Sequence, residues 1–459
     1  MKLEPRNGSE LAPSWLRGDA DSQDALAGRI NSVKTIQAIA LAASFATSLS
    51  ILAVGAAGPV SFNEIKATNA KGNSQTAVNN SSQALANAGT KTSPDIAIWS
   101  SASSFNYLGM NSANSAGAAI NDSGVVAGAA NNSGLSEAFI WQPNQGIEWL
   151  GSLGSGMSVA TAINDSGAIV GLSYNAADQQ HAFLWTQSGG MTDLTPDLTS
   201  IGGATATAIN DSGEVAGYYF PNGSHWPIGF SWTQAGGLQN LGPSGTVVNA
   251  LNDAGTIVGQ APNAAGLKHA FAWTPSGGLQ DLGTLGGASS TALSVNKNGW
   301  VVGTSLTTAN TGFLHAFLWT PAGGMQDLTQ LAGLVKSMQP YSVKVNDYGV
   351  VALSSNNGLE LLSPKMYANL TSSQNPSTYG QPVTFTVTVT SIAGPPPDGE
   401  LVNFTVNGVL YASEPLSNGF AQFTTSSIPT GQHVVAAKYV GDTNYLPNSY
   451  EALHQQVNP

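Results

Sequence analysis

Short alternating or β-branched runs recur through the middle of the chain, over residues 95–363. In each unit a run such as ATAIN leads into a polar turn, IVG or VVG follows the turn, and runs such as HAFLW and GGMxDL complete the unit. Alternation with a period of two is typical of strands with one buried face. Four strands of about six residues, joined by four short turns, need roughly 44 residues. The pattern therefore predicts a repeating unit of four strands.

Two phase-locked series of residues mark this repeat. The first is a turn that reads Asn, then Asp or Lys, then any residue, then Gly, and it begins at Asn121, Asn164, Asn210, Asn252, Asn296 and Asn346. The second series consists of the tryptophans Trp99, Trp141, Trp185, Trp232, Trp273 and Trp319. A four-stranded repeat of about 40 to 50 residues is typical of a β-propeller blade, which buries its faces only by stacking on its neighbours.

The number of blades follows from counting strands. Six complete sets of four lie between Tyr107 and Leu361, with one extra strand around Trp99. We predict six blades, with the Trp99 strand overlapping the last blade to close the ring. Seven blades are an alternative that needs three more strands from residues 61–94, where large apolar side chains are few. An open solenoid with the same period is a further alternative.

The repeat gives way at about Pro364 to longer alternating strands, such as VTFTVTVTS from Val383 and ELVNFTVNG from Glu400. Turn residues separate them at intervals of about 8 to 12 residues, which predicts an immunoglobulin-like sandwich over residues 364–459. The predicted fold class is therefore all-β: a six-bladed β-propeller followed by an Ig-like β-sandwich.

The N-terminal part predicts export. A polar leader over residues 1–34 precedes an uncharged, mostly apolar segment within residues 35–60. The run at 36–57 is long enough to span a bilayer core of about 30 Å, so it is interpreted either as a cleaved signal peptide or as a retained signal-anchor helix. Residues 61–94 are rich in Asn, Ser and Ala and predict a disordered stalk. A membrane is expected as a partner only through the apolar segment.

Composition removes several classes of function. The chain has no cysteine, which excludes disulfides and thiolate chemistry. The net charge of −12 opposes binding to nucleic acid, so none is expected as a partner. The Asn-Asp turns lack the alternate carboxylates and the final Glu of a calcium loop. No metal and no cofactor is predicted.

Two stretches resemble known bacterial families. The phrase HAFLWTPxGGMxDLGxLGG, joined to AxAINxxGxVVG, resembles the HAF-type extracellular repeat, most closely at His269 to Gly287 and at His315 to Leu328. TYGQPVTFTVTV and GxHVVxAKYxGDxNY resemble the bacterial Ig-like domain of the group 3 type, found in cell-surface and adhesin proteins. The resemblances imply an exported protein, and neither carries a catalytic residue across.

Candidate site residues lie where the repeat is broken. His, Asp and Trp at repeated positions are interpreted as architectural, the Trp series as core between blades. The clearest break follows VAGYYF in the third unit, where a cluster of aromatic residues predicts a platform for a glycan or a peptide, with covering a blade edge as the alternative. The candidate ligand-binding residues are Tyr218, Tyr219, His225 and Trp226.

Export, repetition and the lack of a catalytic constellation together predict a function. We expect a non-enzymatic cell-surface or secreted protein, also compatible with the periplasm, whose propeller binds an extracellular glycan or a surface protein. A propeller hydrolase acting on an extracellular polysaccharide is one alternative, although no catalytic residue is assigned. A purely structural envelope component is the other.

Overall fold

The computed structural model describes residues 62–66, 74–90, 93–99, 105–110, 115–197, 201–308, 314–334, 340–355, 358–391, 393–442, 445 and 450–459. The predicted leader and the apolar segment at 36–57 lie outside these residues. Among the residues that the structure describes, no helix is both long and apolar enough to cross a membrane.

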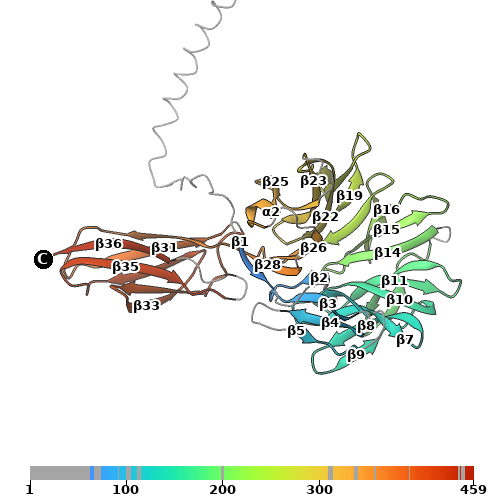
Figure 1. The fold of residues 1–459 in the computed structure, drawn as a ribbon, viewed down its shortest axis with the longest axis horizontal. Helices are drawn as coiled ribbons and strands as arrows, with labels where there is room; N and C mark the ends of the chain where they lie inside the picture. The colour runs from blue at the N-terminus through green and yellow to red at the C-terminus, as the bar shows by residue number, and fades with distance from the viewer. Residues whose placement is uncertain are drawn as a thin grey trace, which may run out of the picture. The chain divides into compact units, whose positions relative to one another are not determined.

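The described residues between 62 and 364 form seven four-stranded sheets, which we call blades 1 to 7 (Figure 1). Within each sheet, every strand pairs antiparallel with the next. Blades 1 to 3 consist of β2 (Ser74–Val78), β3 (Ala84–Thr90), β4 (Ser93–Trp99) and β5 (Phe105–Tyr107); β6 (Ala116–Ile120), β7 (Val126–Asn132), β8 (Leu135–Gln142) and β9 (Gly146–Trp149); and β10 (Gly154–Ile163), β11 (Ile169–Asn175), β12 (Gln180–Thr186) and β13 (Gly190–Asp193).

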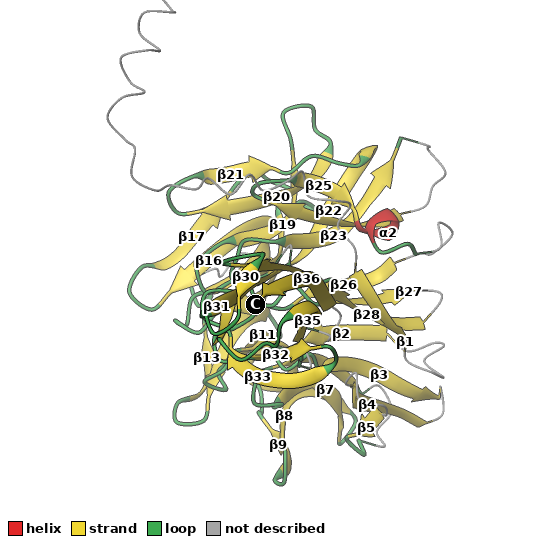
Figure 2. Cartoon of the chain, turned by 90° about the vertical axis from the view of Figure 1, so that its left-hand side faces the viewer, coloured by secondary structure: helices red, strands yellow, loops and turns green. Residues whose placement is uncertain are grey.

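The next three blades keep the same strand order. Blades 4 to 6 consist of β14 (Ile201–Ile209), β15 (Val215–Pro221), β16 (Ile228–Thr233) and β17 (Gly237–Leu241); β18 (Val247–Leu251), β19 (Ile257–Pro262), β20 (Lys268–Thr274) and β21 (Gly278–Asp281); and β22 (Gly286–Val295), β23 (Val301–Thr307), β24 (Leu314–Thr320) and β25 (Gly324–Asp327). The short helix α2 (Leu328–Leu331) follows blade 6 and is shown in red in Figure 2.

Blade 7 joins the two ends of the ring. It contains β26 (Pro340–Val345), β27 (Val351–Ser355) and β28 (Gly358–Pro364), and its fourth strand is β1 (Phe62–Lys66) from the other end. β1 pairs antiparallel with β28. The strand at Trp99 does not join the last blade but belongs to blade 1. The count of six preferred from the sequence is thereby corrected to seven sheets.

The segment predicted as a disordered stalk supplies the missing strands. β1, β2 and β3 lie within it. The prediction failed because it required several large apolar side chains, whereas mostly small ones suffice between stacked sheets: Ala84 and Ala86 are fully buried, with Leu85 between them in the sequence. An inner strand flanked on both sides by neighbouring blades needs little side-chain volume to be covered.

A glycine and a phenylalanine face each other in the middle of blades 2 to 6 and explain the recurring VG and HAF phrases. The pairs are Gly128–Phe139, Gly171–Phe183, Gly217–Phe230, Gly259–Phe271 and Gly303–Phe317. A Cβ atom at Gly217 would lie 2.2 Å from the Thr205 carbonyl oxygen and 2.8 Å from Cζ of Phe230. Only glycine leaves room for the buried ring.

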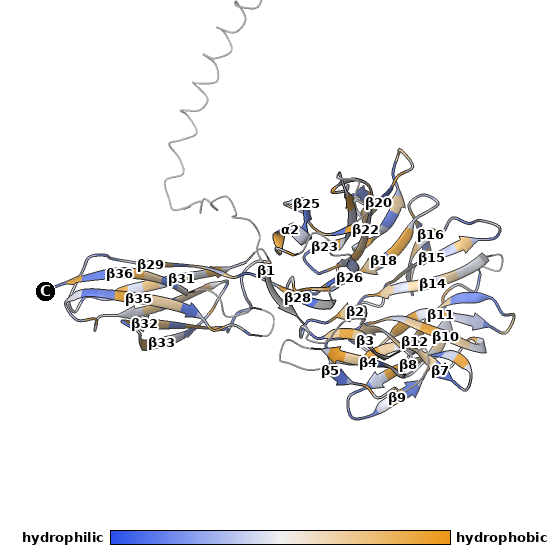
Figure 3. Ribbon diagram, viewed as in Figure 1, coloured by the Kyte–Doolittle hydropathy of each residue, from blue (hydrophilic) through white to orange (hydrophobic). Residues whose placement is uncertain are grey.

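The other repeated residues are architectural, as predicted. Trp99 and Trp185 are buried in core clusters, and the remaining members of the series pack against such clusters. The three repeated histidines each place Nδ1 within 2.8 to 2.9 Å of an aspartate on the fourth strand, in the pairs His181–Asp193, His269–Asp281 and His315–Asp327. Figure 3 shows hydrophobic residues along inner strands such as β18 and hydrophilic ones toward outer strands such as β9.

The C-terminal domain has two sheets, as expected for an Ig-like sandwich. One sheet has the order β29-β31-β34 and the other β30-β36-β35-β32-β33. Phe385, Phe404 and Tyr439 are fully buried between them. The strands are β29 (Tyr367–Ser372), β30 (Ser377–Thr378), β31 (Val383–Thr390), β32 (Leu401–Val406), β33 (Val409–Pro415), β34 (Phe420–Thr425), β35 (Gly431–Tyr439) and β36 (Tyr450–Asn458).

Candidate functional site

Each blade turns from its first strand to its second through a tight loop that starts with a buried asparagine. In blade 2, Asn121 donates its backbone N–H to the Val125 carbonyl, and its Oδ1 accepts the Val125 N–H at 2.9 Å. Gly124 closes the loop with φ of +76°, a backbone conformation that favours glycine. The asparagine therefore fixes its own turn, as an Asx-type turn does.

The same asparagines join neighbouring blades. The Nδ2 of Asn121 donates to the backbone carbonyl of Asn164, the equivalent residue of blade 3, at 3.2 Å. The contact is repeated at every junction, and the last one, from Asn346 of blade 7 to the Asn79 carbonyl of blade 1, joins residues 267 positions apart. The seven asparagines of this circle are Asn79, Asn121, Asn164, Asn210, Asn252, Asn296 and Asn346.

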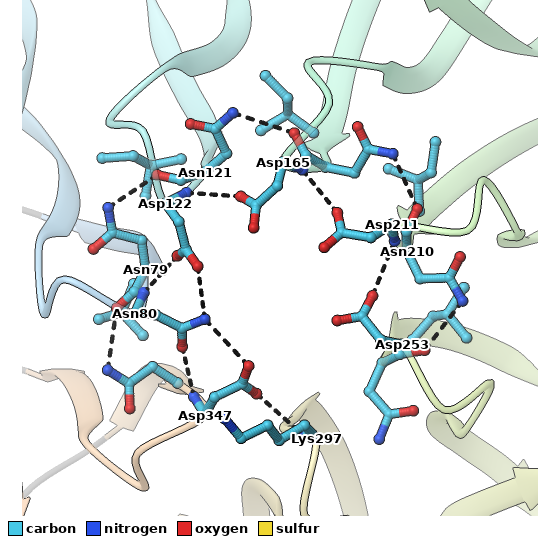
Figure 4. A pocket seen from close by; sticks show the side chains of 18 of the residues that line it. Asn79, Asn80, Asn121, Asp122, Asp165, Asn210, Asp211, Asp253, Lys297 and Asp347 are labelled. Carbon is cyan, nitrogen blue, oxygen red and sulfur yellow. Dashed lines mark hydrogen bonds between the residues drawn. The ribbon is translucent and has the colours of Figure 1, made fainter. Parts of the chain in front are cut away.

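A second circle runs through the residues that follow these asparagines. The backbone N–H of Asp165 donates to Asp211 Oδ1 at 2.9 Å, and six of the seven junctions have this form. The exception lies between Asp253 and Lys297, because a lysine side chain has no acceptor atom. Its members, seen in Figure 4, are Asn80, Asp122, Asp165, Asp211, Asp253, Lys297 and Asp347.

These side chains line a pocket of about 220 Å³ at one mouth of the central channel. Figure 4 shows the carboxylates around the opening, with Asn80 bridging two of them: its Nδ2 donates to Asp122 at 2.8 Å and to Asp347 at 3.1 Å. Five carboxylates face one ammonium group, so the mouth is acidic. Since each Oδ1 that accepts a backbone N–H is held in place, the ring is rigid before any ligand arrives.

One carboxylate of this ring has a raised pKa, mainly because it is partly buried. Partial burial raises the pKa of Asp165 above its usual value, with further increases from the neighbouring Asp122 and Asp211 carboxylates, while the hydrogen bond from the Asp122 backbone lowers it. Burial also raises the pKa of Glu214, in the turn of blade 4. Within the described ranges, no group of three or more His, Asp or Glu side chains is arranged to hold a metal ion.

Lys344 lies two residues before the Asn346 turn of blade 7, at a place where the other blades have a small residue. Blades 1 to 5 have an alanine at the equivalent place on the innermost strand and blade 6 has Ser294. The Lys344 Nζ donates to the Leu293 carbonyl of blade 6 at 2.9 Å. Burial lowers the pKa of this amine to about 8.

The residues predicted as a binding platform lie at the other end of blade 4 and do not share one surface. Neighbouring residues of a strand point to opposite faces, so Tyr219 packs into the core, and its hydroxyl donates to Asn240 on β17 at 3.2 Å. Tyr218 is half-buried and packs edge-on against Phe220. His225 and Trp226, in the loop between β15 and β16, remain exposed.

Sequence reasoning missed the pocket because it discounted repeated residues. The turn residues are architectural one by one, but the ring collects their carboxylates at a single opening. It also missed the seventh turn at Asn79, where Ser82 stands in place of the final glycine with φ of +54°. The available signal was the distance of 42 residues between Asn79 and Asn121, which matches the repeat.

Solved structures resemble this chain only distantly. The chain is similar to the extracellular domain of a hybrid two-component system from B. thetaiotaomicron (13% identity, TM-score 0.37, covering 82% of this chain and 54% of that one). It is also similar to virginiamycin B lyase from Staphylococcus aureus (9% identity, TM-score 0.41, covering 66% of this chain and 98% of that one). The chain thus spans about half the length of the first structure, and likenesses at these TM-scores carry no argument about function.

Comparison with families separates the two parts of the chain. No curated protein matches the sequence. The HAF-type resemblance of residues 95–363 therefore stays a prediction. In the C-terminal part, residues 370–458 match the family model of the bacterial Ig-like domain (group 3), in agreement with the sandwich described above.

Proposed function

We propose that this chain is an exported, non-enzymatic binding protein of the cell surface or the extracellular space. Its seven-bladed propeller presents the acidic pocket at the channel mouth to a glycan or a surface protein, and the Ig-like domain serves as a spacer or a second adhesive module. The observation that carries the proposal is the circle of carboxylates fixed by backbone amides. Hydrogen-bond acceptors held in place favour recognition of hydroxyl or amino groups at low entropic cost.

The test is saturable binding of the exported chain to a panel of soluble neutral, amine-bearing and acidic oligosaccharides. Asp211→Asn keeps the acceptor for the Asp165 N–H and removes one charge, so we expect binding at the mouth to weaken by about tenfold with the fold intact. Asp398→Asn is the matched control, because Asp398 is an exposed aspartate of the Ig-like domain that also accepts a backbone N–H, from Asn418 at 2.6 Å.

A propeller hydrolase is the second candidate, favoured by the raised pKa of Asp165 beside two other carboxylates. A carboxyl group that stays protonated at higher pH can act as a general acid. Turnover of any saccharide in the panel, abolished by Asp165→Asn, would overturn the non-enzymatic proposal. A chain without any saturable ligand would instead be a structural envelope component.

A further inference from the structure

The loop between β15 and β16 holds an exposed tryptophan in a fixed position. Trp226 is 57% exposed. Its backbone N–H donates to Ser224 Oγ at 3.0 Å, and the same hydroxyl donates back to the Trp226 carbonyl at 3.1 Å. The next residue, Pro227, is buried, and its carbonyl accepts the Gly245 N–H at 2.7 Å. A large apolar ring is therefore displayed to solvent on a backbone that is already ordered.

The neighbouring blade supports this ring. A Cβ atom at Gly245 would lie 3.9 Å from Cε3 of Trp226 and 3.4 Å from the ring of Pro262. Gly245 has φ of +98° and no side chain, so the indole can approach the backbone between blades 4 and 5. The equivalent loops of blades 3 and 5 are shorter and contain no tryptophan. The feature is specific to this junction.

A lysine from blade 5 adds a positive charge. The Nζ of Lys268, the first residue of β20, lies 5.4 Å from the centre of the Trp226 ring. Lys268 is exposed and forms no ion pair with any carboxylate of the described residues. In a chain with a net charge of −12, a cation beside an open aromatic face marks a place where an anion is favoured over a cation.

We propose that Trp226 and Lys268 form a binding site for an acidic saccharide, with a uronate as the simplest unit. The apolar face of a sugar ring packs on the indole, as apolar groups pack on aromatic faces generally. The ammonium group leaves its weak contact with the indole and pairs with the sugar carboxylate in a charge-assisted hydrogen bond. Exposed His225 lies beside Trp226 and offers ring nitrogens to the hydroxyls.

This site is independent of the proposed function of the channel mouth. β15 runs from the Asn210 turn to the Trp226 loop, so the two places lie at opposite ends of blade 4. The mouth is acidic, whereas Lys268 of blade 5 places a positive charge beside the Trp226 loop, so the two ligands are expected to differ in charge. Failure of one site therefore leaves the other unaffected, and variants at each site separate them.

The experiment measures binding of the exported chain to an oligogalacturonate, to its methyl ester and to an oligoglutamate of equal charge. Calorimetry gives the dissociation constants. We expect Trp226→Ala to weaken binding of the acidic sugar by about tenfold or more. We expect Lys268→Met to weaken binding of the acid by about fivefold and leave the ester unchanged. High salt should reduce the preference for the acid.

Trp149→Ala is the matched control, because Trp149 is 36% exposed on blade 2. Asp211→Asn tests separation from the channel mouth. Both should bind the oligogalacturonate as the unchanged chain does, and circular dichroism verifies the fold of every variant. Equal affinity for acid and ester, equal affinity for oligoglutamate, or binding that survives Trp226→Ala would each overturn the proposal. So would a loss of binding in Trp149→Ala as large as that in Trp226→Ala.

Discussion

Blades 2 to 6 and the two blades at the closure solve the same packing problem with different residues. The regular blades pair a glycine with a phenylalanine in their centre. Blade 1 pairs Ala86 with Ala97 instead, and blade 7 pairs Leu353 with Glu360. Blade 1 also departs at the turn, where Ser82 replaces glycine, whereas blade 7 keeps Gly349 there. The consensus is therefore weakest in the two blades where the ends of the segment 62–364 meet.

The hydrogen bonds of the asparagine circle do not share this variation. Asn79 of blade 1 and Asn346 of blade 7 make the same inter-blade contact as the regular blades. Core pairs can be exchanged as long as their combined volume suits the space, whereas a buried amide and carbonyl without partners would cost free energy at every junction. The asparagine circle is therefore the fixed element of the repeat, and the core pair is the adjustable one.

The largest effect should come from forcing a regular blade toward the closure type. Gly217→Ala places a methyl group 2.2 Å from the Thr205 carbonyl oxygen. We expect the free energy of unfolding to fall by about 3 kcal/mol, because a backbone atom has to shift. Guanidinium denaturation measures it. Gly202→Ala, whose Cβ would meet its nearest neighbour at 3.4 Å, is the control. A loss below about 1 kcal/mol for Gly217→Ala would mean that regular blades are as adjustable as blade 1.

The asparagine circle should be equally important in both kinds of blade. Asn210→Ala in blade 4 and Asn79→Ala in blade 1 each remove an inter-blade donor and the acceptor within a turn. We expect each to lower the free energy of unfolding by about 2 kcal/mol. Exposed Asn222, in the Trp226 loop, is the control, and Asn222→Ala should change it by less than about 0.5 kcal/mol. A clearly smaller loss at Asn79 would show that the circle weakens at the closure.

The free energy of unfolding should depend on pH through Lys344 of blade 7. Its pKa is about 8 in the folded chain, against 10.5 for an ordinary lysine. Between these values the unfolded chain binds the proton more tightly, so stability should rise as pH increases from about 8 to about 10.5. Since Lys344 as a whole is only partly buried, solvent screens the amine, and we expect a rise of about 1.5 kcal/mol in the free energy of unfolding.

Lys344→Met should remove this rise, and the difference between the two pH profiles isolates it from tyrosine titration. Parallel profiles for the chain and the variant would contradict the burial of the amine. Thermal unfolding at several pH values is sufficient for the measurement.

The smallest effect should come from repairing the gap in the second circle. Lys297→Asn gives the Asp253 N–H an acceptor like Asn80, which accepts the Asp347 N–H at 2.8 Å. We expect a gain of up to about 1 kcal/mol in the free energy of unfolding, reduced by the loss of one favourable charge near the carboxylates. The comparison belongs in high salt, where that charge matters least. A lower free energy of unfolding for Lys297→Asn in high salt would show that the absence of the hydrogen bond at this junction stabilises the native ring.

Much of the fold followed from local sequence signals. Strand type, strand number per unit and the place of the Ig-like domain depend on alternation and turn residues, which a window of a few residues contains. Blade 1 was not predicted, because it lacks the glycine of the turn and the phenylalanine of the core. Its Ala-rich strands have the composition of a linker. The pairing of β1 with β28 was not predicted because the two strands lie about 300 residues apart in the sequence.

The sites were harder to predict because they combine residues from different blades. Trp226 was identified from the loop alone, but Lys268 lies in the next blade and its nearness depends on stacking. The acidic mouth forms only when the turns of all seven blades come together around the channel. A residue can be structural in its own blade and functional as a member of the ring, and a single sequence does not separate these roles.

The pairing of β1 with β28 has a consequence for the order of folding. Of the strands in the seven blades, β1 is synthesised first. Its partner β28 follows about 300 residues later, so this contact has an unusually large sequence separation. Blades 1 to 6 can form one after another from local contacts while the chain emerges. Blade 7 has to wait with one edge unpaired, and an unpaired edge invites strands from other molecules. Ring closure is therefore the step at which we expect folding to be slowest and aggregation to compete most strongly.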